Sequence, residues 1–269
     1  MCSPATAALF LSQVQPRRRG LAARLLPALA LFAALWFSLT ARGEDWNARV
    51  LAQMQAMPRG GGYQANRLAA ERLTAAVGIQ GGALVVQAAQ ASPSFCSEAT
   101  YLVFLKTAQP ALQHLESSTL DALLVRQGQP DGHGVWGRWN ANGPGTARLF
   151  RELGLGPNFD DFAQARLGDF MKIFWSQEVG SRERGHSVIF LGCEQQGGVE
   201  CVRFWSSNVP GGYGEKVVPR TRIAYAIFSR LEHPEALGRL AGIPAVCPYL
   251  ARLATGSSSR AEARAMVGM

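Results

Sequence analysis

The sequence lacks the residue patterns of several common kinds of site. It contains only four histidines in 269 residues, and neither His114 nor His133 has Cys, His or Asp neighbours at zinc-ligand spacing. No glycine-rich phosphate loop follows a predicted strand, and no segment repeats. We therefore expect neither a metal site nor a bound cofactor.

Acidic residues are absent before Glu44, and this explains most of the net charge. The formal charge is +8, from 27 Lys and Arg against 19 Asp and Glu. From Glu44 onward, 22 basic residues face the 19 acidic ones, which is an ordinary surface charge and argues against nucleic acid as a main partner. The remaining basic residues precede Glu44, and they are Arg17, Arg18, Arg19, Arg24 and Arg42.

An uncharged run from Leu25 to Ala41 follows the arginines. A positive stretch, an apolar run of about 17 residues and then small residues are the parts of an export signal. We predict that residues 1–43 are a signal peptide, or alternatively an uncleaved N-terminal membrane anchor. Either places the rest of the chain on the periplasmic or extracellular side, with membrane contact only through this segment.

Residues 44–253 are predicted to form one α+β domain. Helices first and strands later are typical of helices packed on one face of a short antiparallel sheet. The tail, 254–269, is rich in serine and charge and is predicted to be flexible. Periodicity predicts helices over 46–57, 64–77 and 112–125 and near 92 and 146, and strands over 170–175, 186–193, 199–206 and 222–228.

Cys96 lies in the first turn of a predicted helix. Ser92 or Ser94 can cap this helix, and Pro93 suits a first helical position. The unpaired N–H groups of a helix start stabilise a thiolate, which is the nucleophilic form of cysteine. Cys96 is therefore the candidate nucleophile, the alternative being a small apolar residue that only packs.

His186 opens the apolar run G-H-S-V-I-F-L-G after a polar loop. At the solvent end of a core strand, its ring can project into a cleft while the rest of the strand is buried. Imidazole titrates near neutral pH, so it can take the thiol proton and return it to a leaving group. His186 is the candidate base for Cys96.

Cys193 and Cys201 flank the turn-like stretch E-Q-Q-G-G, and we predict a cross-strand disulfide between them. If they pair directly, the same register places His186 opposite Asn208, with Ser206 on the same face. The Asn208 amide oxygen could then accept the imidazole N–H. A slip of two residues would make Ser206 the neighbour instead.

Two further features are candidates for contact with a substrate. Gln90 lies six residues before Cys96, and it could fold back across the Ser-Pro-Ser turn to help bind the oxyanion of a tetrahedral intermediate together with the Cys96 N–H. The stretch H-G-V-W-G-R-W-N-A-N-G-P-G could line a glycan or peptide cleft with Trp136, Trp139 and Asn140. The alternative to such a cleft is a structural loop that is held in place by buried tryptophans.

The order of these motifs resembles the papain-like superfamily, in particular its bacterial NlpC and CHAP branches. Those families have a helix-start Cys, a G-D strand and a G-H strand with the catalytic histidine, and Gly168-Asp169 and Gly185-His186 match the latter two. W-S-S-N resembles the strand end that supplies the third catalytic group in CHAP proteins, and Gln90 is similar to the oxyanion glutamine of papain. The resemblance covers about 83–208.

The sequence also departs from these families. The nucleophile stands in F-C-S-E rather than in D-C-S-G or C-T-W, the stretch from His186 to Asn208 is long, and the helical part over 109–162 is large.

The resemblance implies a papain-like hydrolase. Together with the export signal, it implies an amide substrate in peptidoglycan peptides. An acyltransferase or transpeptidase using the same Cys-His pair and an inactive envelope binding module stay open as alternatives.

Overall fold

The computed structural model describes residues 45–269, which form one compact unit. The predicted signal peptide or anchor over 1–43 lies outside the described residues. Within the described part, none of the helices has both the length and the apolar character needed to cross a bilayer.

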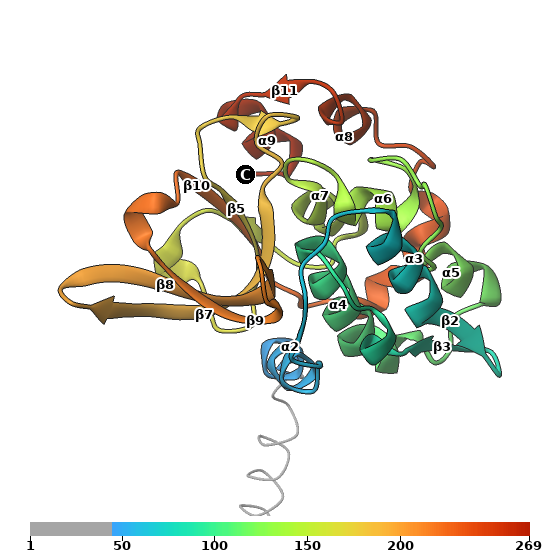
Figure 1. The fold of residues 1–269 in the computed structure, drawn as a ribbon. Coiled ribbons are helices and arrows are strands. Elements are labelled where there is room, and N and C mark those ends of the chain that lie inside the picture. The colour runs from blue at the N-terminus through green and yellow to red at the C-terminus, as the bar shows by residue number, and fades with distance from the viewer. Residues whose placement is uncertain (1–44) are drawn as a thin grey trace, which may run out of the picture. The chain divides into compact units, whose positions relative to one another are not determined.

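An antiparallel sheet of seven strands forms one side of this unit (Figure 1). Most of the helices cluster on the other side, and the β7–β8 hairpin extends away from them. The predicted α+β class is confirmed. In spatial order, the strands are β1 (Gly60–Gly61), β9 (Gly212–Pro219), β8 (Val199–Asn208), β7 (His186–Gln196), β5 (Phe170–Phe174), β10 (Tyr225–Ser229) and β4 (Asn158–Phe159).

The helices fall into an early group and a late group in the chain. Between the helices α3 and α4 stand a two-stranded hairpin, β2 (Val77–Gln80) and β3 (Ala83–Val86), and a short 3-10 turn, η2 (Ala88–Gln90). The α-helices are α2 (Trp46–Gln55), α3 (Arg67–Ala76), α4 (Cys96–Leu112), α5 (Ser117–Ala122), α6 (Gly134–Asn140), α7 (Gly145–Leu153), α8 (Pro248–Leu253) and α9 (Arg260–Met266).

Helix α4 is the centre of the core, because most of its side chains are buried. Phe104 of this helix stacks on Trp139 of α6 with ring centroids 4.6 Å apart, and Trp139 meets Phe170 of β5 edge-on at 5.3 Å. All three rings are at most 2% exposed, and burying such a side chain stabilises a fold by about 1.5–3 kcal/mol. The cluster joins α4 to the sheet and so fixes where its first residue lies.

The same cluster corrects the prediction of an aromatic cleft. The glycine-rich stretch is not a loop but contains α6, and Trp136 and Trp139 are 5% and 0% exposed. The Trp139 indole N–H donates to Thr100 Oγ1 at 3.1 Å, inside the core. Two large rings on one side of a short helix stabilise it by burial, so neither tryptophan is available to a ligand.

The prediction of a flexible tail over 254–269 is also wrong. Strand β11 (Ser257–Ser258) pairs with β6 (Val179–Gly180), and Ser259 caps α9 by accepting the N–H of Glu262. Ala263 and Val267 are buried. The charged residues of α9 thus lie on the outer face of a helix whose small apolar residues pack inward.

The predicted disulfide between Cys193 and Cys201 is not present, and both are free thiols. In the hairpin, Cys193 pairs with Val202 and Cys201 pairs with Glu194, so the two cysteines are displaced by one residue. Neighbouring positions on a strand point to opposite faces, and a bridge between the two thiols would need a different register.

Candidate functional site

Cys96 is the first residue of α4, as predicted. Neither Ser92 nor Ser94 caps the helix; Phe95 is the N-cap residue, and its N–H donates to Glu98 Oε2 at 3.0 Å. The backbone N–H of Cys96, at the first helical position, has no acceptor within the helix and can serve an oxyanion.

Instead of capping the helix, Ser94 connects the start of α4 to the sheet through hydrogen bonds with Ser207 of β8. Its hydroxyl donates to Ser207 Oγ at 2.9 Å, and the Ser207 hydroxyl donates to the Ser94 carbonyl at 3.0 Å. Both residues are fully buried. This pair fixes Cys96 relative to β8, whose next residue is Asn208.

His186 lies at the start of β7, and its Nε2 is 3.1 Å from Asn208 Oδ1. The Asn208 amide nitrogen donates to the carbonyls of Ser206 (3.2 Å) and Gly214 (2.8 Å), which leaves Oδ1 as the atom facing the ring. Because a carbonyl oxygen accepts only, the imidazole carries its proton on Nε2. Nδ1 is then the nitrogen that can take a proton from the thiol.

His186 lies beside Asn208 as predicted, although Cys193 and Cys201, from which this register was predicted, do not pair. A β-bulge explains the difference. Near the hairpin turn, the register differs by one residue from the predicted one, as the Cys193–Val202 pair shows. The ladder shifts between Phe190 and Gly192, and beyond this point Ile189 pairs with Trp205. The bulge therefore restores the predicted register at the end of the hairpin that carries the histidine.

The electrostatics of the site favour a thiolate at Cys96. Burial raises the pKa of the thiol, but the charge and hydrogen bond of His186, the Lys172 ammonium and a backbone hydrogen bond from Ser187 together lower it from 9.0 to about 6. At neutral pH, most of this thiol is ionised. It therefore exists as the form that attacks a carbonyl carbon.

Lys172 is a site residue that the sequence analysis missed. It is 4% exposed on β5, and its Nζ lies 3.2 Å from Ser187 Oγ and 3.5 Å from the Ala141 carbonyl. Burial lowers its pKa, whereas the charges of Cys96 and Asp131 raise it. The available signal was a lysine inside the apolar strand F-M-K-I-F, since lysine is seldom buried without a partner.

Glu98 lies fully buried two residues after Cys96, in the first turn of α4. Burial raises its pKa to about 9, against the lowering effect of the Phe95 N–H, so the carboxyl is neutral at pH 7. A second negative charge beside the thiolate is thereby avoided. Glu98 can thus hold the helix start through its hydrogen bond without opposing ionisation of the cysteine.

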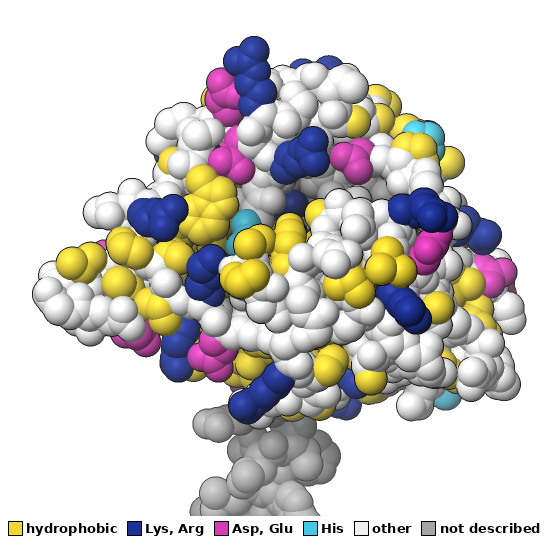
Figure 2. Space-filling model, viewed as in Figure 1, with side chains coloured by type: hydrophobic (Ala, Val, Ile, Leu, Met, Phe, Trp, Pro, Cys, Tyr) yellow, Lys and Arg dark blue, Asp and Glu magenta, His cyan; other side chains and the backbone are white. Residues whose placement is uncertain are grey.

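Two cavities meet at Cys96. One, of about 620 Å³, is lined by polar groups that include Asp131, Asn140 and Lys172. The other, of about 520 Å³, contains His186 and Asn208. Figure 2 shows this face hollowed between the sheet and the helices, with Lys and Arg side chains on the rim and a histidine within it. A substrate can therefore extend to both sides of the thiol.

The predicted site residues do not all meet here. Asn140 lines the larger cavity and accepts the Ser97 hydroxyl at 2.6 Å. Ser206 donates to the Ser187 carbonyl at 2.7 Å instead of contacting the imidazole. Gln90 is exposed, hydrogen-bonds Gln87 and lines neither cavity, so the structure does not bring it to the thiol.

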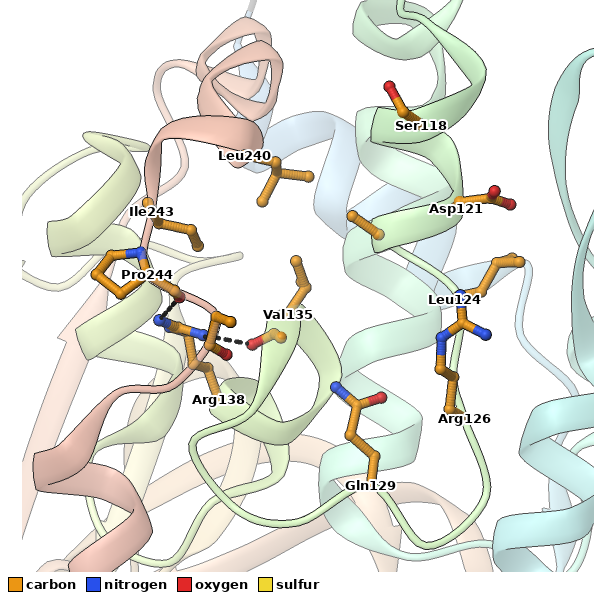
Figure 3. A pocket seen from close by; sticks show the side chains of 13 residues that line it. Ser118, Asp121, Leu124, Arg126, Gln129, Val135, Arg138, Leu240, Ile243 and Pro244 are labelled. Atoms are coloured by element: carbon orange, nitrogen blue, oxygen red, sulfur yellow. Dashed lines mark hydrogen bonds between the residues drawn. The ribbon is translucent and has the colours of Figure 1, made fainter.

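A third cavity, of about 350 Å³, lies between α5, α6 and the segment over 240–245 (Figure 3). Its most buried polar residue, Arg138, is 0% exposed and donates to the carbonyls of Gly134 (2.9 Å) and Pro244 (2.7 Å). No cysteine or histidine lines it. Arg138 is fully engaged in holding the fold, so this cavity offers no comparable chemistry.

Comparisons with known proteins give no relative. No family model matches the chain, and neither the curated proteins nor the solved structures give a match. Within residues 45–269, no three His, Cys, Asp or Glu side chains gather as metal ligands would. The geometry around Cys96 is therefore the basis for a functional assignment.

Alkylation by iodoacetamide tests the electrostatics of Cys96 directly. The rate is expected to rise with pH around a midpoint of about 6, since only the thiolate reacts. Lys172→Met removes a nearby positive charge and should move this midpoint upward by about 1 pH unit. Lys106→Met, also a lysine and located within α4, should leave it unchanged. A wild-type midpoint near 8.5 would contradict the thiolate assignment.

Proposed function

We propose that the protein is an exported cysteine hydrolase that cleaves an amide bond, with Cys96 as nucleophile, His186 as general base and acid, and Asn208 as the residue that orients the imidazole. The observation that carries the proposal is the continuous contact from the Cys96 thiol through the His186 ring to the Asn208 amide. A cysteine that only packs would need neither an imidazole nor a buried lysine beside it.

The chemistry follows from these positions. The thiolate adds to the amide carbonyl carbon, and the Cys96 N–H stabilises the oxyanion. Protonated His186 gives its proton to the leaving nitrogen as the C–N bond breaks, which releases an amine and leaves a thioester. Water then attacks the thioester while His186 takes its proton, and the acid product leaves as the thiolate forms again.

Two considerations support a peptide of peptidoglycan as substrate and a papain-like arrangement. The predicted export signal would place the hydrolase at the cell envelope. The helix-start cysteine beside antiparallel strands that carry the G-D and G-H motifs agrees with the resemblance to the NlpC and CHAP branches. The substrate belongs to the proposal because it depends on that resemblance.

Product analysis by mass spectrometry tests the proposal. Purified protein is incubated with peptidoglycan fragments, with and without an added amine acceptor. Products that have gained one water support a hydrolase, while products joined to the acceptor would indicate an acyltransferase. Absence of any product together with absence of thiol labelling would favour an envelope binding module instead.

Variants of the two strand-end residues test the role of Asn208. Asn208→Ala should lower kcat by about tenfold to a hundredfold, because a hydrogen bond to a charged group contributes about 1.5–3 kcal/mol. Ser206→Ala is the control, since its hydroxyl bonds the Ser187 carbonyl and should affect stability more than kcat. A silent Asn208→Ala beside a damaging Ser206→Ala would reverse the two roles.

A further inference from the structure

The position of His186 assigns the two cavities to the two halves of an amide substrate. His186 lines the 520 Å³ cavity and does not line the larger one. Because the imidazole must protonate the leaving nitrogen, the amine half of the substrate lies on its side of the thiol. The acyl half then extends into the larger cavity.

The amine-side cavity is rich in positive charge. Four basic residues from three segments line it: two lie in the loop before β7, one lies in β9 and one lies in η4 (Arg220–Arg222). Glu183 is the one acid among the residues that line it. The basic residues are Arg182, Arg184, Lys216 and Arg222.

Glu183 forms no ion pair with these cations, because its carboxylate accepts hydrogen bonds from backbone N–H groups of the surrounding loop. It accepts the N–H groups of Trp175 (2.9 Å), Ser176 (3.1 Å) and Gly185 (3.1 Å). Arg182 lies 3.7 Å from Glu178. Among the described residues, the other three cations of the cavity have no carboxylate within 4.0 Å.

The cavity also has an apolar wall. Trp175 and Val209 line it and are 40% and 64% exposed, although large apolar side chains are usually covered. The larger cavity shares Arg184 with this one and also contains the buried Lys172. It differs because the Asp131 carboxylate lines it as well; burial raises the pKa of that carboxyl, whereas the charges of both cations lower it. Arg182, Lys216 and Arg222 line only the amine-side cavity, so the excess of positive charge lies on that side.

We propose that the amine-side cavity binds a carboxylate, so that the preferred substrate carries a free carboxylate on the amine half next to the scissile amide. Arginine guanidinium groups bind carboxylates through two parallel hydrogen bonds, and the apolar wall suits the aliphatic part of an amino-acid residue. The proposal deepens the hydrolase assignment and rests on it for the identity of the two halves.

A matched pair of substrates tests this inference. One is a peptidoglycan stem peptide with a free carboxylate on its amine half, and the other is the same peptide with that carboxylate converted to a primary amide. We expect kcat/KM to be about tenfold higher for the acid. Arg222→Gln and Lys216→Met should each bring this ratio toward one, whereas Arg126→Gln, at the cavity of Figure 3, should leave it unchanged.

Binding separates failure of this inference from failure of the proposed function. The dissociation constants of both peptides are measured on the Cys96→Ala variant, which cannot form the thioester. Tighter binding of the acid, reduced in the double variant Cys96→Ala/Arg222→Gln and by added salt, supports the carboxylate site even without turnover. Equal binding and equal kcat/KM of the two peptides would overturn it while leaving the hydrolase intact.

Discussion

Replacement of His186 by alanine is expected to lower kcat/KM by about 10²–10⁴, the usual effect of losing a general base. The reason is that the ring lowers the pKa of the Cys96 thiol and, in the proposed mechanism, also protonates the leaving nitrogen. The alkylation midpoint should therefore move from about 6 toward 9.0 in the same variant. Steady-state kinetics and the pH dependence of iodoacetamide labelling measure the two effects independently.

The matched control is His233→Ala. His233 is an exposed histidine 3.1 Å from Glu235, outside both cavities at Cys96, and its loss should leave both readouts unchanged. Circular dichroism should show that both variants stay folded. If His186→Ala keeps full activity and an unshifted midpoint, the Cys96–His186 assignment is wrong.

Asp169→Ala should lower the free energy of unfolding by about 3–5 kcal/mol, the typical result of removing one partner of a buried ion pair. Asp169 is 0% exposed and lies 2.8 Å from Arg230 Nη2. It also accepts the Asn47 side-chain amide at 2.8 Å and the Arg166 N–H at 2.7 Å. One carboxylate thus connects α2, the strand β5 and the segment after β10.

Urea denaturation measures this loss, with Glu71→Ala as the control. Glu71 forms an exposed pair with Arg67 and should change stability by less than about 1 kcal/mol. Asp169 belongs to the G-D motif, so a catalytic role is the competing explanation. Loss of activity without loss of stability in Asp169→Ala would favour that role over the structural one.

The positions of Cys96 and His186 could be predicted because they depend on local features of the sequence. The strand that begins at His186 can be read from periodicity. The helix start was predicted close to Cys96, although the serines expected to cap it do not do so and Phe95 is the N-cap residue. The partner Asn208 depends on strand register, which is not local. The assumed Cys193–Cys201 pair was wrong by one residue, and the bulge near Leu191 compensates for that error at the end of the hairpin that carries His186.

What could not be predicted depends on contacts between distant segments. Lys172 contacts Ala141, and Trp139 contacts Phe170, and neither pairing leaves a periodic signal. The packing of Ala263 likewise follows from a surface that other segments provide. Burial of tryptophans in α6 was the stated alternative to an aromatic cleft, and tertiary packing decides between the two.

Strand β11 supports one wall of the amine-side cavity from a remote part of the sequence. Ser257–Ser258 pairs with β6, and the Ser181 N–H donates to the Gly256 carbonyl at 2.9 Å, directly before Arg182 and Arg184. Residues near 256 can therefore shift the presentation of these arginines without touching Cys96 or His186. In the proposed hydrolase, substitutions near residue 256 could thus change the selectivity for the amine half of the substrate while leaving the cleavage step at Cys96 unchanged.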